Sequence, residues 1–131
     1  MRKIFLVTDY NCNNACISCA KRSDEKGKLT FQDIVQVIDS IKPTKEDYIE
    51  ISGGEPTLRA DLFDVINHIK SSCTTNVILL SNGRRFKDMA YSERIKATGL
   101  DRVMTTFYSH DEKIHDFITQ RKGSLLILLK G

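Results

Sequence analysis

Short apolar runs alternate with longer helical patterns along this chain, and this alternation limits the fold more than any other feature of the sequence. The apolar runs are residues 3–8, 48–52, 76–80 and 102–108, and each predicts a β-strand. Strands separated by helical stretches form parallel sheets, because a parallel pair needs a long crossover connection. The sequence therefore predicts an α/β fold built from about four βα units.

Helix start and stop signals fill the intervals between these strands. Thr30 is a predicted N-cap, with Asp33 three residues later in an approximate capping box. Asp61 is predicted to cap a second helix, and Gly99 to end a third helix over residues 87–98. Ile114, Phe117 and Ile118, at helical spacing, predict one more short helix before Gly123.

Length and composition indicate one soluble globular domain, residues 1–131. The chain has 40% hydrophobic and 28% charged residues, and 20 basic against 17 acidic groups leave a net charge of +3. Like charges form no long block, so we expect neither a nucleic-acid-binding arm nor a membrane-binding patch. The apolar runs are too short for a signal peptide or a membrane span. We therefore expect a cytoplasmic protein, in which thiols stay reduced.

Three cysteines lie within eight residues, directly after the first predicted strand. Cys12, Cys16 and Cys19 have the spacing C-x3-C-x2-C. Three thiolates this close can hold three corners of an iron–sulfur cube and leave one iron open. A zinc site remains an alternative and needs a fourth ligand. The remaining candidates for that ligand are single and distant: Cys73, which we take for a bystander, and His68, His110 and His115.

The other unusual segments also follow strands. Gly53-Gly54-Glu55-Pro56 follows the second strand, Ser81-Asn82-Gly83 the third, and Ser109 the fourth. In parallel α/β folds the loops after the strands share one end of the sheet, where ligands bind. Two glycines would let a ligand approach the backbone, and the Glu55 carboxylate can accept hydrogen bonds from an ammonium group. Taken alone, Gly-Gly-Glu is more often an ordinary turn with an exposed glutamate.

Taken together, these residues resemble the radical S-adenosylmethionine (radical SAM) enzymes over nearly the whole chain. The resemblance rests on the cysteine motif, the Gly53–Pro56 loop, Ser81-Asn82-Gly83 and the stretch from Tyr108 to Ser124. It implies a partial TIM-type barrel, of which this chain has about four of the usual six βα units. The 131 residues would then form a C-terminally incomplete radical SAM core domain.

The resemblance also implies roles for individual residues. Cys12, Cys16 and Cys19 would ligate a [4Fe-4S] cluster whose open iron chelates SAM. Glu55, presented by Gly53 and Gly54, would hold the SAM amino group. Ser81 and Ser109 would contact the SAM carboxylate or ribose, or else cap their strand ends. His110, His115 and Asp116 are expected to cap and orient the following helix.

The implied reaction is reductive cleavage of SAM to a 5′-deoxyadenosyl radical, which abstracts hydrogen from the substrate. A flavodoxin-type or ferredoxin-type electron donor would supply the electron. The substrate is unknown. The stretch from Ser109 to Ser124 is similar to relatives that modify peptides, which makes a peptide one substrate class.

The sequence departs from the family pattern at two places. Ser18 stands where relatives carry an aromatic residue near the adenine, and Tyr10 or Ile17 would have to compensate. The run 125–129 is apolar on all sides, which would leave the edge of the fourth strand exposed for association with another chain. The alternative hypothesis is a non-catalytic iron–sulfur or zinc module, completed by a partner chain.

Overall fold

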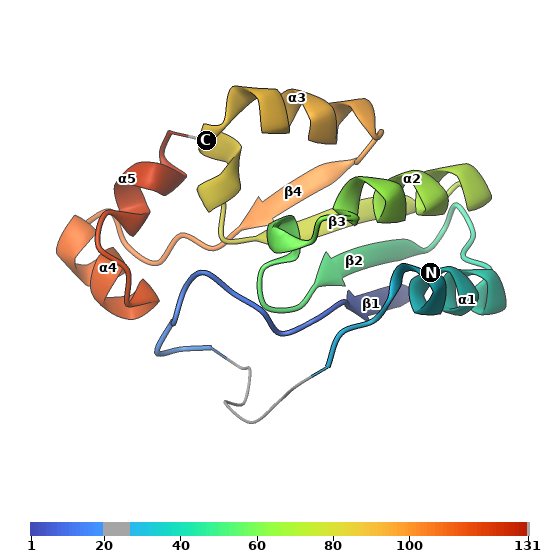
Figure 1. The fold of residues 1–131 in the computed structure, drawn as a ribbon, viewed down its shortest axis with the longest axis horizontal. Coiled ribbons are helices and arrows are strands. Elements are labelled where there is room, and N and C mark those ends of the chain that lie inside the picture. The colour runs from blue at the N-terminus through green and yellow to red at the C-terminus, as the bar shows by residue number, and fades with distance from the viewer. Residues whose placement is uncertain (20–26, 131) are drawn as a thin grey trace.

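The chain folds into one parallel four-stranded sheet with helices packed against it (Figure 1). The computed structural model describes residues 1–19 and 27–130. Strand order follows the sequence, so each crossover leads to the neighbouring strand, and β1 and β2 pair in register from Lys3 with Tyr48 onwards. The strands are β1 (Lys3–Val7), β2 (Tyr48–Ser52), β3 (Asn76–Ser81) and β4 (Arg102–Thr105). The predicted α/β class and its four βα units are confirmed.

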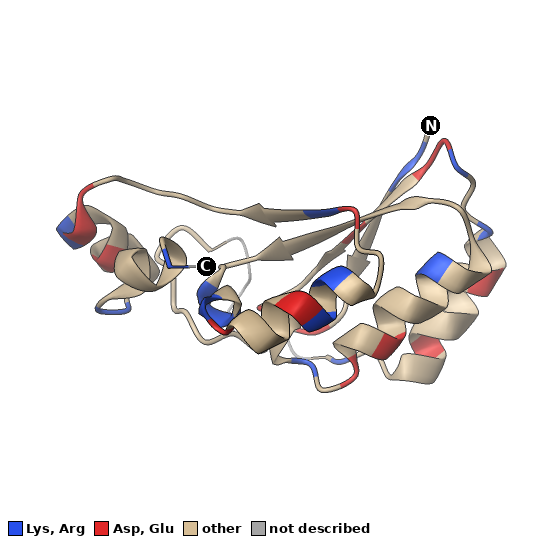
Figure 2. Ribbon diagram, turned by 90° about the horizontal axis from the view of Figure 1, so that it is seen from above, with Lys and Arg blue, Asp and Glu red and all other residues tan. Residues whose placement is uncertain are grey.

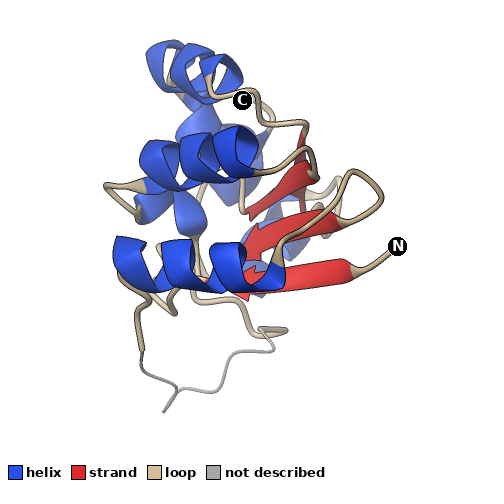
Figure 3. Ribbon diagram, turned by 90° about the vertical axis from the view of Figure 1, so that its right-hand side faces the viewer, coloured by secondary structure: helices blue, strands red, loops and turns tan. Residues whose placement is uncertain are grey.

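Three helices cover one face of this sheet (Figure 3). They are α1 (Phe31–Ile41), α2 (Leu62–Ser72) and α3 (Met89–Ala97). Alternate strand residues point toward the helices, as the period of a β-strand requires, and these are fully buried: Ile49, Ile51, Val77 and Leu79. The same core takes Leu6 from β1 and, from the three helices, Ile34, Ile38, Leu62, Val65, Ile66, Ile69, Tyr91 and Ile95.

Local capping explains where most helices begin and end. Thr30 and Asp33 form the predicted capping box of α1, with the Asp33 N–H donating to Thr30 Oγ1 at 3.1 Å. Gly99 adopts a positive φ of 76° after α3, which confirms it as the predicted stop. Asp61 stands at the N-cap position of α2, but its side chain makes no capping hydrogen bond. Its carboxylate instead pairs with Arg59.

Two short helices follow β4 and lie at the end of the sheet (Figure 1). These are α4 (Glu112–Thr119) and α5 (Ser124–Leu128), and two 3-10 turns, η1 (Pro56–Leu58) and η2 (Arg84–Lys87), lie in the loops after β2 and β3. The short helix predicted before Gly123 is present as α4. Ile114 and Phe117 are exposed, whereas His115 and Thr119 are buried. The buried face of α4 contacts the cysteine segment, as described below.

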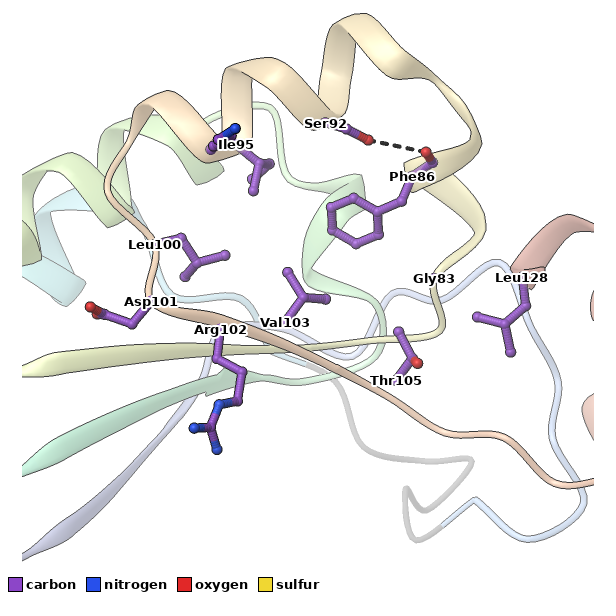
Figure 4. Close-up of a pocket in the computed structure, with 11 residues that line it drawn as sticks. Gly83, Phe86, Ser92, Ile95, Leu100, Asp101, Arg102, Val103, Thr105 and Leu128 are labelled. Carbon is purple, nitrogen blue, oxygen red and sulfur yellow. Dashed lines mark hydrogen bonds between the residues drawn. The ribbon is translucent and has the colours of Figure 1, made fainter. Parts of the chain in front are cut away.

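The β4 strand forms the last edge of the sheet among the described residues, and each of its residues is exposed. A groove of about 480 Å³ runs beside it. Figure 4 shows Phe86, Ile95, Leu100 and Val103 pointing into this groove, with Leu128 of α5 at its far end. The predicted exposed edge is therefore present, and an apolar groove lies beside it. Association through this edge remains a prediction.

Charged residues of both signs are interspersed along the helices and loops (Figure 2). In the described ranges, no helix has the length and apolar character needed to cross a bilayer.

Candidate functional site

The carboxyl ends of the strands surround a cavity of about 290 Å³ that contains all three cysteines of the motif. Gly53, Gly54 and Ser81 line it too, so the structure brings together residues from the loops after three different strands. The expected convergence of these loops is present. The rest of the lining comes from Asn14, Ser52, Leu80, Asn82, Met104, Thr105, Thr106, Tyr108, His115 and Thr119.

The three cysteines are free thiols with different exposure. Cys12 and Cys16 are half-buried and Cys19 is exposed. Burial raises the pKa of the Cys12 thiol, although a hydrogen bond from the Asn14 N–H at 3.4 Å opposes that shift. A turn in which the Cys19 N–H donates to the Cys16 carbonyl at 3.2 Å brings the last two cysteines onto one loop.

This donor set fits an iron–sulfur cluster. Thiolates are its usual ligands, and N–H groups aimed at sulfur stabilise their charge. The amide of Asn82 also lies 4.0 Å from Cys12 Sγ. Among the described residues no three His, Cys, Asp or Glu side chains converge closely enough for one ion. A cubane takes each thiolate at a different iron, so its ligands surround a volume rather than a point.

The glycine pair allows the cysteine segment itself to approach β2. The Gly54 N–H donates to the Asp9 carbonyl at 2.9 Å, and the Glu55 N–H to the Asn11 carbonyl at 2.7 Å. A Cβ at Gly53 would lie 2.3 Å from the Asp9 oxygen, and one at Gly54 only 2.1 Å from the Asn11 oxygen. The structure shows that the glycines make room for the backbone that leads to Cys12. The room that they would leave for a ligand remains a prediction.

Glu55 lies behind the cavity and not in its lining. Its side chain is buried, with 1% of the residue exposed. One carboxylate oxygen accepts from Thr57 N at 3.1 Å, Thr57 Oγ1 at 2.5 Å and Ser81 Oγ at 2.8 Å. The other oxygen accepts from Asn82 N at 2.6 Å. Glu55 thus joins the loop after β2 to the loop after β3, and its contact with SAM remains a prediction.

The two predicted serines differ in position. Ser81 lines the cavity, but its hydroxyl donates to Glu55 and accepts from the Gly83 N–H at 3.0 Å. Ser109 is not part of the lining; its hydroxyl accepts from the Asp111 N–H at 3.0 Å, just before α4. Thr105, the last residue of β4, and Thr106, the next residue, form part of the cavity wall. Sequence reasoning missed them because two threonines at a strand end look like ordinary β-strand residues.

The C-terminal end of α4 holds the cysteine segment from the other side. The last carbonyls of a helix have no partner within it. Here the Thr119 carbonyl accepts from Ala15 N at 3.1 Å and the Ile118 carbonyl from Ile17 N at 2.9 Å. Arg121 Nε adds a hydrogen bond to the Asn13 carbonyl at 2.9 Å. Both residues that flank Cys16 are therefore held by α4.

Tyr108 and His115 form the aromatic wall of the cavity. The Tyr108 N–H donates to His115 Nδ1 at 3.4 Å, and the two ring centroids lie 5.6 Å apart. A neutral ring that accepts at Nδ1 carries its proton on Nε2. The pKa of Tyr108 is raised: a hydrogen bond with Ser18 lowers it, but burial and the nearby thiols Cys16 and Cys19 outweigh that effect. The aromatic residue beside the cysteines thus comes from the segment after β4, and it contacts Ser18.

The other histidines and acids near α4 have structural partners or lie outside the cavity. Asp116 accepts hydrogen bonds from the N–H groups of Gly123 and Leu125, so it orients α5 as expected. His110 is exposed and does not line the cavity.

Cys73 donates to the Ile69 carbonyl at 3.1 Å and packs against the core, as expected of a bystander.

A parallel α/β sheet with a cysteine-lined cavity at the carboxyl ends of its strands is the architecture of barrel-type α/β proteins, which bind their ligands at that end. Comparison with protein families narrows this class. The Radical SAM superfamily model matches residues 7–130. The chain therefore belongs to the radical SAM superfamily, and the resemblance inferred from its motifs is confirmed.

Curated relatives include archaeal proteins named "Probable GTP 3',8-cyclase". The one from Methanococcus maripaludis strain S2 is 36% identical over 134 residues, covering 100% of this chain and 44% of the relative. The one from Thermoplasma volcanium is 34% identical over 110 residues, covering 82% of this chain and 33% of the relative. The chain thus spans less than half the length of these relatives.

Solved structures share the fold at low sequence identity. BtrN in complex with AdoMet and 2-DOIA has a TM-score of 0.67 at 17% identity, over 83% of this chain and 46% of BtrN. Native anSMEcpe with bound AdoMet has a TM-score of 0.66 at 17% identity, over 98% of this chain and 40% of that protein. This chain corresponds to part of such a barrel, as its four βα units indicate.

Proposed function

We propose that the cavity holds a [4Fe-4S] cluster through Cys12, Cys16 and Cys19 and that SAM binds beside it. The observation that carries this proposal is the shared cavity, in which the three cysteines meet the glycine loop of the next strand. When bound, the cluster would supply the electron that cleaves SAM to methionine and a 5′-deoxyadenosyl radical. In the whole protein that radical would abstract hydrogen from the substrate.

The residues of this chain would bind and orient the two groups. The cavity lining holds a buried acceptor without a hydrogen-bond partner, Asn14 Oδ1, which a ligand could use. A buried oxygen without a donor is costly, and an amino group of SAM would satisfy it. Tyr108 offers an aromatic face for the adenine ring. Thr106 and Ser81 stand at the ends of adjacent strands, where they would contact the polar parts of SAM.

GTP is the first substrate to test, because the curated relatives carry the name GTP 3',8-cyclase. A peptide is the second class, as the sequence after Ser109 suggested. The open face of the sheet favours a peptide over GTP, because a peptide carries less negative charge. Phe5 and Met104 are exposed on it, and Lys3 is already paired with Glu50 at 2.7 Å. A triphosphate needs several unpaired cations, and this face offers few of them among the described residues.

Electron paramagnetic resonance (EPR) tests the cofactor proposal directly. The full chain is reconstituted anaerobically with iron and sulfide, reduced, and measured with and without SAM. We expect a cluster signal that changes when SAM is added, because SAM would bind the open iron. A cluster that ignores SAM supports the non-catalytic module, and a chain that holds only zinc overturns the cluster assignment.

Turnover is a separate question. The reconstituted chain is incubated with dithionite, or with flavodoxin or ferredoxin as electron donor, and 5′-deoxyadenosine is measured with GTP and with peptides. We propose a cytoplasmic setting, where such donors occur. Because the chain spans less than half of its curated relatives, we expect little or no product from it alone.

A further inference from the structure

Arg59 is a fully buried cation just after the Gly-Gly-Glu-Pro loop. Its side chain has 0% exposure, although no part of the proposed chemistry uses it. A buried guanidinium persists only where its charge is paired and its N–H groups find acceptors. The acceptors around Arg59 therefore show what this residue does.

Both ends of the cysteine-bearing connection accept hydrogen bonds from Arg59. Nη1 donates to the Leu29 carbonyl at 2.9 Å and to the Thr8 carbonyl at 3.4 Å. Thr8 is the residue after β1, and Leu29 lies just before the cap of α1. The Leu29 N–H also donates to the Thr8 carbonyl at 2.8 Å, and Asp9 pairs with Lys28 in an antiparallel bridge. The two ends of the connection thus meet at one guanidinium.

The remaining nitrogens of Arg59 are occupied by carboxylates. Nε and Nη2 form a bidentate pair with Asp61 at 2.9 and 2.8 Å. Asp9 Oδ2 lies 3.9 Å from Nη1 and adds a second negative charge. Each nitrogen of Arg59 therefore has an acceptor within the protein. This excludes Arg59 as a contact for SAM or for a substrate phosphate in this conformation. It also explains why Asp61 does not cap α2.

From this geometry we propose that Arg59 is a positioning residue for the metal centre: it closes the cysteine-bearing connection at its base. The identity of the bound cluster rests on the proposed function. The closure of the connection rests only on the hydrogen bonds of Arg59. Bringing the ends of a long connection together costs entropy. A clamp that holds Thr8 beside Leu29 removes that cost before metal binding. The three thiols are then confined to one cavity, as a preorganised ligand set requires.

The test compares Arg59→Gln and Arg59→Lys with Arg2→Gln as a matched control. Arg2 also makes a bidentate pair, with Asp47, but at the opposite end of the strands from the cysteines. Each full-length variant is reconstituted anaerobically, and its loss of iron to a chelator is followed. Circular dichroism checks that the apo variants fold. Hydrogen exchange at the Leu29 and Gly54 amides reports closure without metal.

We expect Arg59→Gln to lose iron on the order of 10-fold faster than wild type, and its Leu29 amide to exchange faster. Arg59→Lys should keep part of the iron retention and part of the protection of the Leu29 amide. A lysine retains the positive charge but lacks the planar set of N–H donors of a guanidinium. Arg2→Gln should lower the melting temperature and leave both readouts unchanged. Wild-type rates of iron loss and amide exchange in Arg59→Gln would overturn the proposal. The same increase of both rates in Arg2→Gln as in Arg59→Gln would overturn it too.

The two proposals can fail separately. If wild type takes up no cluster, the proposed function fails, and closure by Arg59 is still decided by exchange at Leu29 and Gly54 in the apo protein. If Arg59→Gln does not fold, the comparison of Arg59→Lys with wild type decides in its place.

Discussion

The N–H of Glu55 donates to the carbonyl of Asn11 at 2.7 Å, so the motif that follows β2 is hydrogen-bonded to the segment that carries the cysteines. Together with the bond from Gly54 to Asp9, it extends the pairing of β1 with β2 beyond the sheet. The two motifs of the family are therefore parts of one backbone structure. A substitution that shifts the backbone of one motif should therefore displace the other.

Gly54→Ala should disrupt the cysteine site through steric contact alone. The new Cβ would lie 2.1 Å from the Asn11 carbonyl oxygen, which is backbone and cannot rotate away. We expect iron content after anaerobic reconstitution to fall severalfold. Gly99→Ala is the control: it places a residue at a φ of 76°, but its Cβ would meet only Lys70 Cε at 3.8 Å. Normal iron content in the Gly54→Ala variant would contradict this account.

Cys16→Ala should abolish cluster binding, because the two remaining thiolates are too few ligands to retain a [4Fe-4S] cluster. Cys73→Ala should retain it, since Cys73 packs against the core, remote from the cavity lining. Iron and sulfide per chain are the measurement. Equal loss in both variants would indicate general unfolding rather than ligand removal.

Glu55→Ala should lower the stability of the apo protein as well as weaken SAM binding. Removal of the carboxylate leaves the buried donors of Thr57, Ser81 and Asn82 without their acceptor. An unsatisfied buried group costs about 1–3 kcal/mol, so the melting temperature should drop by several degrees. The cluster should still form. Ser81→Ala, which removes one of the donors, should cost less, and an unchanged melting temperature for Glu55→Ala would show that these bonds contribute little.

Tyr108→Ala should weaken SAM binding by roughly 2- to 10-fold, as expected for the loss of one aromatic contact. Tyr108→Phe keeps the ring and should bind nearly as well as wild type. Phe107→Ala is the matched control, because Phe107 is the neighbouring aromatic residue and does not line the cavity. Titration of the reconstituted chain with SAM, followed by EPR, measures these affinities. Wild-type affinity in Tyr108→Ala would remove the ring from the SAM site.

Asp47→Asn should destabilise the protein at neutral pH but not in acid. Hydrogen bonds from the Arg2 side chain, with the Thr44 N–H adding, hold the pKa of the Asp47 carboxyl well below its usual range. A lowered pKa in the folded state stabilises it above the unfolded value of about 3.9, and this contribution fades as the pH falls below that value. The melting temperatures of the variant and wild type should therefore converge as the solution is acidified through that range. Glu93→Gln, on the exposed side of α3, should show no such difference.

Much of the fold could be predicted because its signals are local. The strand at Tyr48–Ser52, the capping box at Thr30 and the stop at Gly99 depend on residues within a few positions of one another. The cysteine spacing and the Gly53–Pro56 loop were visible in the same way. Together they predicted one site at the carboxyl ends of the strands, and the cavity confirms that they lie together.

The sequence did not predict side-chain contacts that depend on residues far away in the chain. Asp61 has the sequence context of a cap, but a buried arginine takes its carboxylate. The helical spacing of Ile114 and Phe117 predicted α4 but not its buried face, which carries His115 and lies against the cysteine cavity. Tyr108 lies beside the cysteines only because of the way the segment after β4 folds back over the end of the sheet. No local pattern contains such information.

The contact between α4 and the cysteine segment sets an order for assembly during synthesis. The carbonyls of Ile118 and Thr119 hold the peptide groups beside Cys16, although more than a hundred residues separate the two segments in the chain. The cysteines leave the ribosome early, but the last part of their frame leaves much later, and contacts of such long range form late in folding. We therefore expect nascent chains that end before α4 to bind iron loosely, and metal delivery to wait until that helix has emerged.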